Sequence, residues 1–258
     1  MLREIRSLMP QYDYLYLGDN ARAPYGSRSF ERVYEFTLQC VRQLFSMGCH
    51  LVILACNTAS AKALRTIQQN DLPLLDASRR VLGVIRPTAE CVGHLSQSGH
   101  VGIVATPGTI RSQTYELEIA KFWPHLRVTG EACPMWVPLV ENHEHASAGA
   151  DYFVKQHLDR LMKSDPQIDT IILGCTHYPL LLPKIRQHLP PSVRLLPQGS
   201  YVAHSLADYF HRHPEMEMRI TQGGRVRYLT TEQPSAFNNS ASVFMGQTVE
   251  AEQVHLTL

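Results

Sequence analysis

The sequence lacks long hydrophobic runs and clusters of like charge. Its apolar stretches fall well short of the roughly 20 residues that a membrane-spanning helix requires. The opening segment, MLREIRSLMP, has no apolar core of the kind found in secretory signals. The 24 basic and 23 acidic residues leave a formal net charge of +1, without a basic stripe or an acidic tail. We therefore expect a cytoplasmic protein that binds neither membranes nor nucleic acid.

Sequence motifs for cofactors and metals are also missing. No G-x-G-x-x-G follows a predicted strand, and no Walker loop for nucleotide phosphates is present. None of the five lysines has an obvious Schiff-base setting, and a pyridoxal lysine, which has no fixed motif, stays open. Cys175 and His177 are two positions apart, which matches no standard zinc arrangement. We expect no cofactor and no metal.

The six cysteines, at 40, 49, 56, 91, 133 and 175, include no C-x-x-C pair. A chain of 258 residues has enough apolar content, 44%, to form a core without disulfides. We therefore expect free thiols in a reducing compartment. For Cys40, Cys49, Cys91 and Cys133 we expect the ordinary role of a small buried hydrophobic residue.

Apolar runs alternate with segments of helical period, which predicts an α/β fold with mostly parallel sheets and right-handed crossovers. Several runs are continuously apolar, as in strands that are buried on both faces. The predicted strands are 13–18, 49–56, 72–76, 100–106, 168–175 and 192–197. The predicted helices are 28–47, 58–69, 81–97, 108–122, 147–163, 179–189 and 200–212. In the less regular segment 213–258, we expect strands within 223–231 and 249–258 that flank a polar loop.

Four predicted strands end alike, in YLGDNA, LACNTA, IVATPGT and ILGCTHYP. Small or hydroxyl-bearing residues stand where the next helix should begin. Ligands of open α/β sheets bind outside the carboxyl ends of the strands, where helix N-termini attract anions. The alternative is simple helix capping, which favours the same residue types. The candidate anion contacts are Asn57, Thr58, Thr106, Thr109 and Thr176.

Two of these strand ends carry a cysteine, Cys56 and Cys175, in similar sequence contexts. This repetition suggests two similar halves that each present a thiol to one cleft. A thiol at a helix N-terminus can have a lowered pKa. Two thiols on opposite sides of a carbon can act as general base and general acid, which would racemise it. The reference thiol pKa of ~8.5 makes both protonation states accessible near neutrality.

Three further features have two interpretations each. His177 either activates the neighbouring thiol of Cys175 or caps and packs a helix start. Glu141, at the end of an apolar run, is either a solvated acid at a helix start or a carboxylate that orients a catalytic group. Tyr25 and Gly26 lie in a Pro/Gly-bearing loop that either turns the chain or contacts ligand.

At these residues the chain resembles the cofactor-independent Asp/Glu racemase superfamily, and within it the glutamate racemases. The matching segments are GDNARAPYGSRS (18–29), ACNTASA (55–61), VGIVATPGTI (101–110), CPMWVPLVE (133–141) and GCTHYPLL (174–181). They occur in the family's order, and the resemblance extends to about residue 212.

The resemblance implies two α/β lobes related by a pseudo-twofold axis, with the active site between them. The first lobe would comprise 1–82 plus 197–258 and the second 83–196. The chain would interconvert L- and D-glutamate for peptidoglycan synthesis, and we expect a homodimer because family members are often dimers. Cys56 and Cys175 would be the acid/base pair, with His177 and Glu141 assisting. The implied substrate and supporting contacts are Asp19, Tyr25, Gly26, Asn57, Thr58, Thr106, Thr109, Thr176 and His177.

The start of the chain departs from the family pattern. Family members open with a strand that ends in an Asp-Ser-Gly turn, which supplies a catalytic carboxylate and a substrate contact. The sequence instead opens with what resembles the following helix. Our hypothesis is a start site assigned too late, with a GTG codon read as Met1; a true truncation is the rival, and it would leave a poorly folded or inactive protein.

Two alternatives to a glutamate racemase stay open at this stage. One keeps the fold and changes the substrate, to aspartate or another small carboxylic acid. The other is a two-lobed protein that binds a small molecule without catalysis. The paired thiols and the missing export signal count against the second alternative.

Overall fold

A continuous parallel sheet organises the middle of the chain. In this computed structural model, which describes residues 1–256, its strands lie in the order β5-β4-β6-β7. The inner strand β6 is buried on both faces, as its apolar run TIILG predicts. The bounds are β4 (His100–Ala105), β5 (Arg127–Ala132), β6 (Thr170–Gly174) and β7 (Arg194–Pro197).

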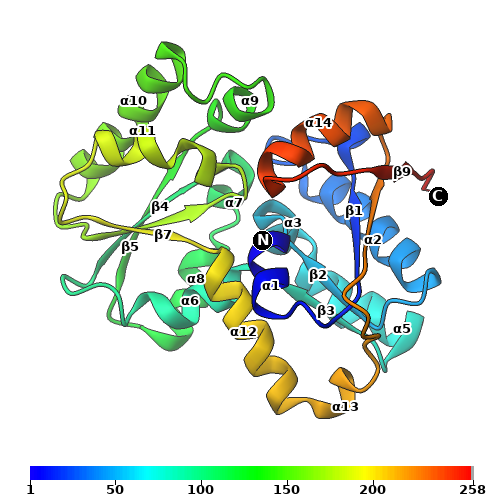
Figure 1. Ribbon diagram of the computed structural model, residues 1–258. Coiled ribbons are helices and arrows are strands. Elements are labelled where there is room, and N and C mark those ends of the chain that lie inside the picture. Colours follow the sequence, from blue (N-terminus) through cyan, green and yellow to red (C-terminus); the bar gives the residue numbers. More distant parts are fainter. Residues whose placement is uncertain (257–258) are drawn as a thin grey trace.

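Helices cover both faces of this sheet and form the second lobe with it (Figure 1). On β6, Ile171 and Leu173 pack toward α9, α10 and α11, whereas Ile172 packs toward α6 and α8. The bounds are α6 (Ile85–Val92), α7 (Pro107–Arg111), α8 (Thr114–Phe122), α9 (Trp136–Glu141), α10 (Ala148–Ser164), a 3₁₀ turn (Tyr178–Leu181) and α11 (Leu182–Gln187).

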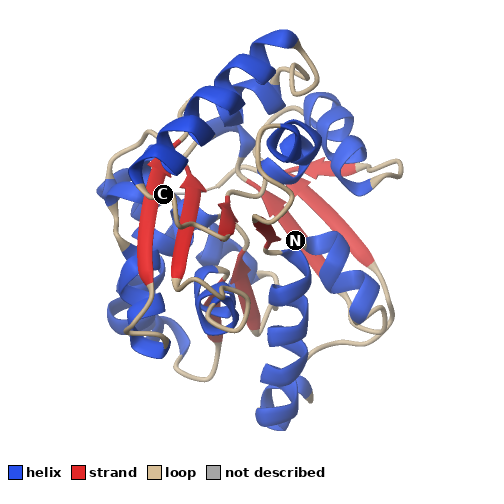
Figure 2. Cartoon of the chain, turned by 90° about the vertical axis from the view of Figure 1, so that its left-hand side faces the viewer, coloured by secondary structure: helices blue, strands red, loops and turns tan. Residues whose placement is uncertain are grey.

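The strands of the first lobe form two separate sheets instead of one. The orders are β1-β8-β9 and β2-β3, and all pairs are parallel. Within residues 1–256, β1 and β2 share no ladder, although α2 packs against both. The bounds are β1 (Tyr14–Gly18), β2 (Leu51–Leu54), β3 (Arg80–Gly83), β8 (Val226–Thr230) and β9 (Ala251–Gln253). Figure 2 shows the strands of the molecule with helices packed around them.

The helices of the first lobe follow local sequence signals. Ser29 caps α2, because its hydroxyl accepts from the Arg32 amide at 3.3 Å. Val33, Thr37 and Val41 then recur on its buried face. The bounds are α1 (Leu2–Leu8), a 3₁₀ turn (Asn20–Arg22), α2 (Phe30–Ser46), α3 (Asn57–Lys62), α4 (Leu64–Thr66), a π turn (Ile67–Asp71), α5 (Leu72–Asp76), α12 (Gly199–Arg212), α13 (Pro214–Glu217) and α14 (Pro234–Met245).

Four predictions of local structure are wrong. Residues 72–76 are helix α5 and not a strand, because a short apolar run cannot distinguish the two and Pro73 fits a first helical turn. The predicted helix 81–97 begins with strand β3. The edge strand β5 was missed because its residues are only partly buried and lack an apolar run. The loop predicted after 231 contains α14, whose one fully buried residue is Phe237.

The predicted strands at both ends of the tail are present in part. β8 lies within 223–231, and β9 covers three residues of 249–258; residues 257–258 of that prediction lie outside the described residues. β8 pairs with β1 over 210 residues away, from Tyr14 opposite Val226 to Gly18 opposite Thr230. The C-terminal segment therefore completes a sheet that the N-terminal segment begins. No helix in the described part is both long and apolar enough to cross a membrane.

The prediction of buried, inert thiols holds fully only at Cys133. Cys40 is half-buried beside the Arg22 guanidinium, which lies 3.8 Å from its sulfur. Cys49 and Cys91 are also half-buried, the first just before β2 and the second at a surface hollow. A cysteine on the surface of a helix or just before a strand is covered on one side only. The sequence pattern does not distinguish such a position from a fully buried one.

Candidate functional site

The carboxyl ends of β4 and β6 bring two of the predicted site segments together. Ala105 and Gly174 are opposite each other in the parallel ladder. Thr106 and Cys175, the next residue in each strand's direction, therefore leave the sheet side by side. This is the edge of a parallel sheet at which ligands bind.

Cys175 is the first member of a hydrogen-bonded chain of three side chains. Its sulfur lies 3.6 Å from Nδ1 of His177. Nε2 of the same imidazole is hydrogen-bonded to the Glu141 carboxylate. Glu141 is the last residue of α9, so the interpretation as an acid at a helix start is wrong. The His177 side chain caps no helix, which removes the capping interpretation. A sulfur, an imidazole and a carboxylate in series can hold and move a proton.

The electrostatics of this chain favour a protonated imidazole. Burial alone would lower the pKa of His177, but its hydrogen bonds to Cys175 and Glu141, and the charges on both, raise it to about 10. The same hydrogen bond lowers the pKa of Glu141, against the opposing effect of burial. At neutral pH the pair is therefore an imidazolium and a carboxylate.

Cys56 stands at the end of β2, at the N-cap of α3, without a comparable chain. Burial raises the pKa of this thiol, and nearby Cys175 contributes in the same direction. The amides of Ala59 and Thr58 and the Thr58 hydroxyl partly offset this rise. Among residues 1–256, no carboxylate or imidazole is hydrogen-bonded to Cys56. The Cys175 thiol is thus near enough to affect the pKa of Cys56 from the other lobe, but the two thiols have different hydrogen-bond partners.

Three threonine hydroxyls meet at the junction between the lobes. Oγ1 of Thr58 lies 2.9 Å from Oγ1 of Thr106 and 3.3 Å from that of Thr109, and the last two are 3.1 Å apart. All three residues are buried. Thr106 also caps α7, since it accepts from the Thr109 amide. The capping interpretation is therefore correct for Thr106, although its hydroxyl also contacts the other lobe.

The loop after β1 is held in shape by hydrogen bonds within the first lobe. The Tyr25 hydroxyl donates to Asp19, which also pairs with Arg22 at 2.8 Å and accepts from Thr231. Burial, then the proximity of Cys40 and the Asp19 hydrogen bond, raise the pKa of Tyr25.

Gly26 is the point of closest approach in this loop. Its carbonyl accepts from the Gly108 amide at 2.8 Å. A Cβ at Gly26 would lie 2.8 Å from the Cβ of Thr106, so a larger residue would push the lobes apart.

Asn57 and Thr176 complete the set of predicted residues. Asn57 is 2% exposed, and its amide bonds to Tyr115 and Gln198. Thr176 is half-buried between Cys175 and His177 in the turn before the 3₁₀ segment. The sequence reasoning missed Tyr115 and Gln198. Gln198 follows a predicted strand directly, so the strand-end rule could have found it. Tyr115 lies inside a helix and carried no signal.

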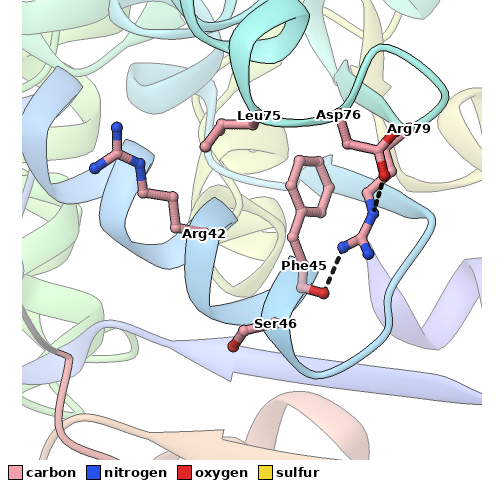
Figure 3. Close-up of a pocket in the computed structure, with 6 residues that line it drawn as sticks. All are labelled: Arg42, Phe45, Ser46, Leu75, Asp76 and Arg79. Carbon is pink, nitrogen blue, oxygen red and sulfur yellow. Dashed lines mark hydrogen bonds and ion pairs between the residues drawn. The ribbon is translucent and has the colours of Figure 1, made fainter.

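Two surface hollows lie away from these residues. One, of about 250 Å³, lies between α2 and α5. Figure 3 shows residues that line it, among them Arg42, Phe45 and Leu75. Arg79 in its wall pairs with Asp76 and donates to the Phe45 carbonyl, so its guanidinium serves the fold. The other hollow, of about 530 Å³, lies between α6 and α12. Within residues 1–256, no group of three or more metal-binding side chains is arranged to hold an ion.

The structure thus gathers the predicted residues into a few connected groups. Cys175, His177 and Glu141 form one hydrogen-bonded chain, and Thr58, Thr106 and Thr109 form a second group that spans both lobes. Asp19 and Tyr25 form a third. Groups two and three are joined where Gly26 meets the α7 segment. Their role in binding and catalysis stays a prediction.

Comparisons with known proteins agree with one another. A family model described as Asp/Glu/Hydantoin racemase matches residues 1–199. A glutamate racemase of Ruegeria sp. (strain TM1040) is 38% identical over 254 residues, which cover 95% of this chain and 91% of that protein. One from Streptococcus suis (strain 05ZYH33) is 35% identical over 255 residues, 98% of this chain and 93% of that protein.

Solved structures give the same result for the fold. A glutamate racemase isoform of Bacillus anthracis superposes with a TM-score of 0.89 at 33% identity, covering 99% of this chain and 92% of that one. The glutamate racemase of Francisella tularensis, solved with D-glutamate, has a TM-score of 0.86 at 28% identity and the same coverage. The predicted two-lobed α/β architecture is confirmed.

Proposed function

This chain belongs to the Asp/Glu/hydantoin racemase family, and we propose that it is a cofactor-independent isomerase that interconverts L- and D-glutamate. The family follows from the match over residues 1–199 and from relatives above 30% identity that cover nearly the whole chain. The substrate is the one that those relatives are named for. What the chain itself adds is a pair of strand-end thiols, one from each lobe.

The proposed mechanism uses these thiols on opposite faces of the substrate α-carbon. One sulfur, as thiolate, takes the α-proton, and the electron pair left on carbon spreads into the adjacent carboxyl group. The other thiol donates its S–H proton to the opposite face, so the configuration inverts. One proton leaves carbon and one returns, and the two sulfurs exchange protonation states. The reverse reaction starts from that exchanged state.

We propose a different starting role for each thiol. Because burial raises the pKa of Cys56, that sulfur holds its proton and is suited to act first as the acid. A protonated imidazole beside a sulfur stabilises thiolate, and the His177 ring lies 3.6 Å from Cys175. Cys175 is therefore suited to act first as the base. Glu141 keeps His177 protonated and oriented in this role.

The α-proton of an amino acid is only weakly acidic, so the developing negative charge must be stabilised. We place the substrate α-carboxylate near the hydroxyl group of Thr58, Thr106 and Thr109. Asn57 and Thr176 flank the two thiols and supply further polar contacts, and the loop with Asp19, Tyr25 and Gly26 closes the site from the first lobe. Donors fixed before the reaction stabilise charge without reorganisation.

The proposed setting follows from the same family assignment. D-glutamate would serve peptidoglycan synthesis in the cytoplasm, and thereby cell-wall formation and cell shape. We propose a homodimer, as in related racemases. We propose lobes of 1–82 plus 197–258 and of 83–196; these boundaries follow the division of strands between sheets to within one residue, at Gly83 and Pro197.

The observation that carries the proposal is the Cys175–His177–Glu141 chain at a strand end of one lobe, together with a second thiol, Cys56, at a strand end of the other. Its test is racemisation of pure L- and pure D-glutamate, without added cofactor, followed by circular dichroism or chiral chromatography. We expect both to approach an equal mixture. L- and D-aspartate are assayed in parallel.

Two outcomes would overturn the proposal. Racemisation of aspartate in place of glutamate would assign the fold to another carboxylic acid. Binding of glutamate without racemisation, unchanged in Cys56→Ala and Cys175→Ala variants, would indicate a non-catalytic binding protein.

A further inference from the structure

Gln198 occupies the point where the chain leaves the second-lobe sheet. It follows the last residue of β7, Pro197, and precedes the first residue of α12, Gly199. Gln198 is buried, with 3% of the residue exposed. A buried primary amide needs partners for two N–H groups and a carbonyl oxygen. The partners of this amide come from both lobes, which indicates a role beyond filling space in the core.

The amide of Gln198 closes a ring of hydrogen bonds with Asn57 and Tyr115. Asn57 Nδ2 donates to Gln198 Oε1 at 2.7 Å. Gln198 Nε2 donates to the Tyr115 oxygen at 2.6 Å, and the Tyr115 hydroxyl donates back to Asn57 Oδ1 at 2.6 Å. Each member donates once and accepts once around the ring, so the orientations of both amides are fixed.

The same amide reaches the other place where the chain passes between the lobes. Nε2 of Gln198 also donates to Thr88 Oγ1 at 2.8 Å and approaches the Val84 carbonyl at 3.4 Å. Thr88 in turn donates to that carbonyl at 3.3 Å. Val84 directly follows β3, and its amide donates to Ser60 of α3. The two segments at which the chain passes between the lobes, at Val84 and at Gln198, are therefore both hydrogen-bonded to the short helix α3.

Helix α3 is the element that carries Cys56 at its N-cap, and Asn57 is its first residue. The strand that leads into it, β2, pairs on one side only within residues 1–256. The position of this thiol therefore depends on side-chain bonds more than that of Cys175, which follows an inner strand. Of those bonds, the ring is the buried set that begins at Asn57, the residue directly after Cys56.

We propose that Gln198 is a positioning residue that holds Cys56 in place through Asn57. This inference rests on the proposed function for its catalytic meaning, but the positioning itself is a property of the ligand-free protein. Loss of the ring frees the Asn57 side chain and loosens the first turn of α3. Because the hydrogen bonds of the ring include Asn57, next to Cys56, and none of them ends at Cys175, we expect the larger effect at Cys56.

The test compares the two thiols in variants that break the ring. Gln198→Met keeps the side-chain length and removes both polar atoms, and Tyr115→Phe removes a single hydroxyl from the opposite side. Gln156→Met, on α10, is the same substitution away from the site. Thr88→Val removes the bonds of Thr88 to Gln198 and to the Val84 carbonyl, and it leaves the three bonds of the ring intact. Melting followed by circular dichroism identifies any variant that does not fold.

The first readout is the rate of iodoacetamide alkylation at each cysteine across pH, quantified on peptides by mass spectrometry. We expect Gln198→Met and Tyr115→Phe to change the rate at Cys56 several-fold and to leave Cys175 within twofold. Thr88→Val and Gln156→Met should match the wild type. If Gln198→Met does not fold, Tyr115→Phe decides the question. Equal changes at both thiols, or none at Cys56, would overturn the proposal.

The second readout is glutamate racemisation by the same proteins. Displacing a reacting group by about 1 Å can cost roughly 100-fold in rate. We expect kcat to fall on the order of 10- to 100-fold in both ring variants, with KM changed less than threefold. A rise in KM at constant kcat would contradict a positioning role. If the wild type does not racemise glutamate, the proposed function fails, while the alkylation result still decides whether Gln198 positions Cys56.

Discussion

The two lobes support equivalent thiols with unequal frameworks. In the second lobe, β6 has a strand on each side and ends at Cys175. In the first lobe, β2 has only β3 beside it within residues 1–256 and ends near Cys56. A strand with two ladders is held by the backbone, whereas one with a single ladder depends on side chains. The hydroxyl of Ser60 and the amide of Asn57 supply that support at α3.

The two thiols also differ in their chemical partners. Cys175 contacts an imidazole backed by a carboxylate. Cys56 has backbone amides and a hydroxyl. The two directions of racemisation are chemically equivalent, but the two thiols proposed to catalyse them have different surroundings. The following predictions test this contrast, from the largest expected effect to the smallest.

Removal of either thiol should have the largest effect. General acid–base groups contribute roughly 10²- to 10⁴-fold to rate. We expect Cys56→Ala and Cys175→Ala each to lose racemisation by that factor, measured by chiral chromatography. The control is Cys91→Ala, at the surface hollow, which should keep near wild-type activity. If either Cys56→Ala or Cys175→Ala retained racemisation, that thiol would not act as an acid or base in the reaction.

The difference between the sheets should appear in stability. Ile172, fully buried in β6, is packed on all sides, so Ile172→Ala should cost about 2–5 kcal/mol. Ile53, in β2, is half-buried, so Ile53→Ala should cost roughly half as much or less. Urea unfolding of both variants measures the two costs. If Ile53→Ala lowered the free energy of unfolding as much as Ile172→Ala or more, the first lobe would be packed as tightly as the second, which contradicts the comparison.

Loss of the carboxylate behind His177 should have a moderate effect. In Glu141→Gln the charged hydrogen bond is gone, which we expect to cost on the order of 10-fold in kcat, or roughly 1.4 kcal/mol. Because Glu141 helps to raise the pKa of His177, the alkaline limb of the pH–rate profile should move to lower pH. Glu144→Gln, nearby and exposed, is the control. An unchanged alkaline limb would contradict the claim that Glu141 raises the pKa of His177 during catalysis.

The smallest expected effect is on the pH dependence of the free energy of unfolding. The folded pKa of His177, about 10, exceeds the unfolded value near 6.5. Its stabilising contribution is therefore complete below pH 6.5 and lost as pH rises through about 10. We expect His177→Gln to remove on the order of 1 kcal/mol of this dependence between pH 7 and 10, as measured by urea unfolding. An identical pH slope in wild type and variant would contradict the raised pKa.

Much of the fold followed from patterns in the sequence. The buried strand β6 was predictable because its continuous apolar run is typical of a strand between two layers. Strand β5 was not, because an edge strand with polar residues leaves no such run. Residues 72–76 were misassigned because a short apolar run does not distinguish a strand from a helical turn, and in that helix Leu74 is 87% exposed.

The site was predictable to a similar degree. Strand ends identified both thiols and the three threonines, since polar residues after apolar runs are a local signal. The contacts of Glu141 and Tyr115 were not derivable, because each joins residues more than 30 positions apart. Such partners depend on how helices pack across the lobes, which no local pattern encodes.

Hydrogen exchange at the α-carbon in D₂O tests the central claim most directly, because it reports each face of the substrate separately. Racemisation alone cannot do so, since an equilibrium constant of one ties kcat/KM to the same value in both directions. We predict that Cys56→Ser exchanges the α-proton of one glutamate enantiomer without inverting it, and that Cys175→Ser does so for the other. Loss of exchange for both enantiomers to the same extent in each variant would contradict thiols that act from opposite faces.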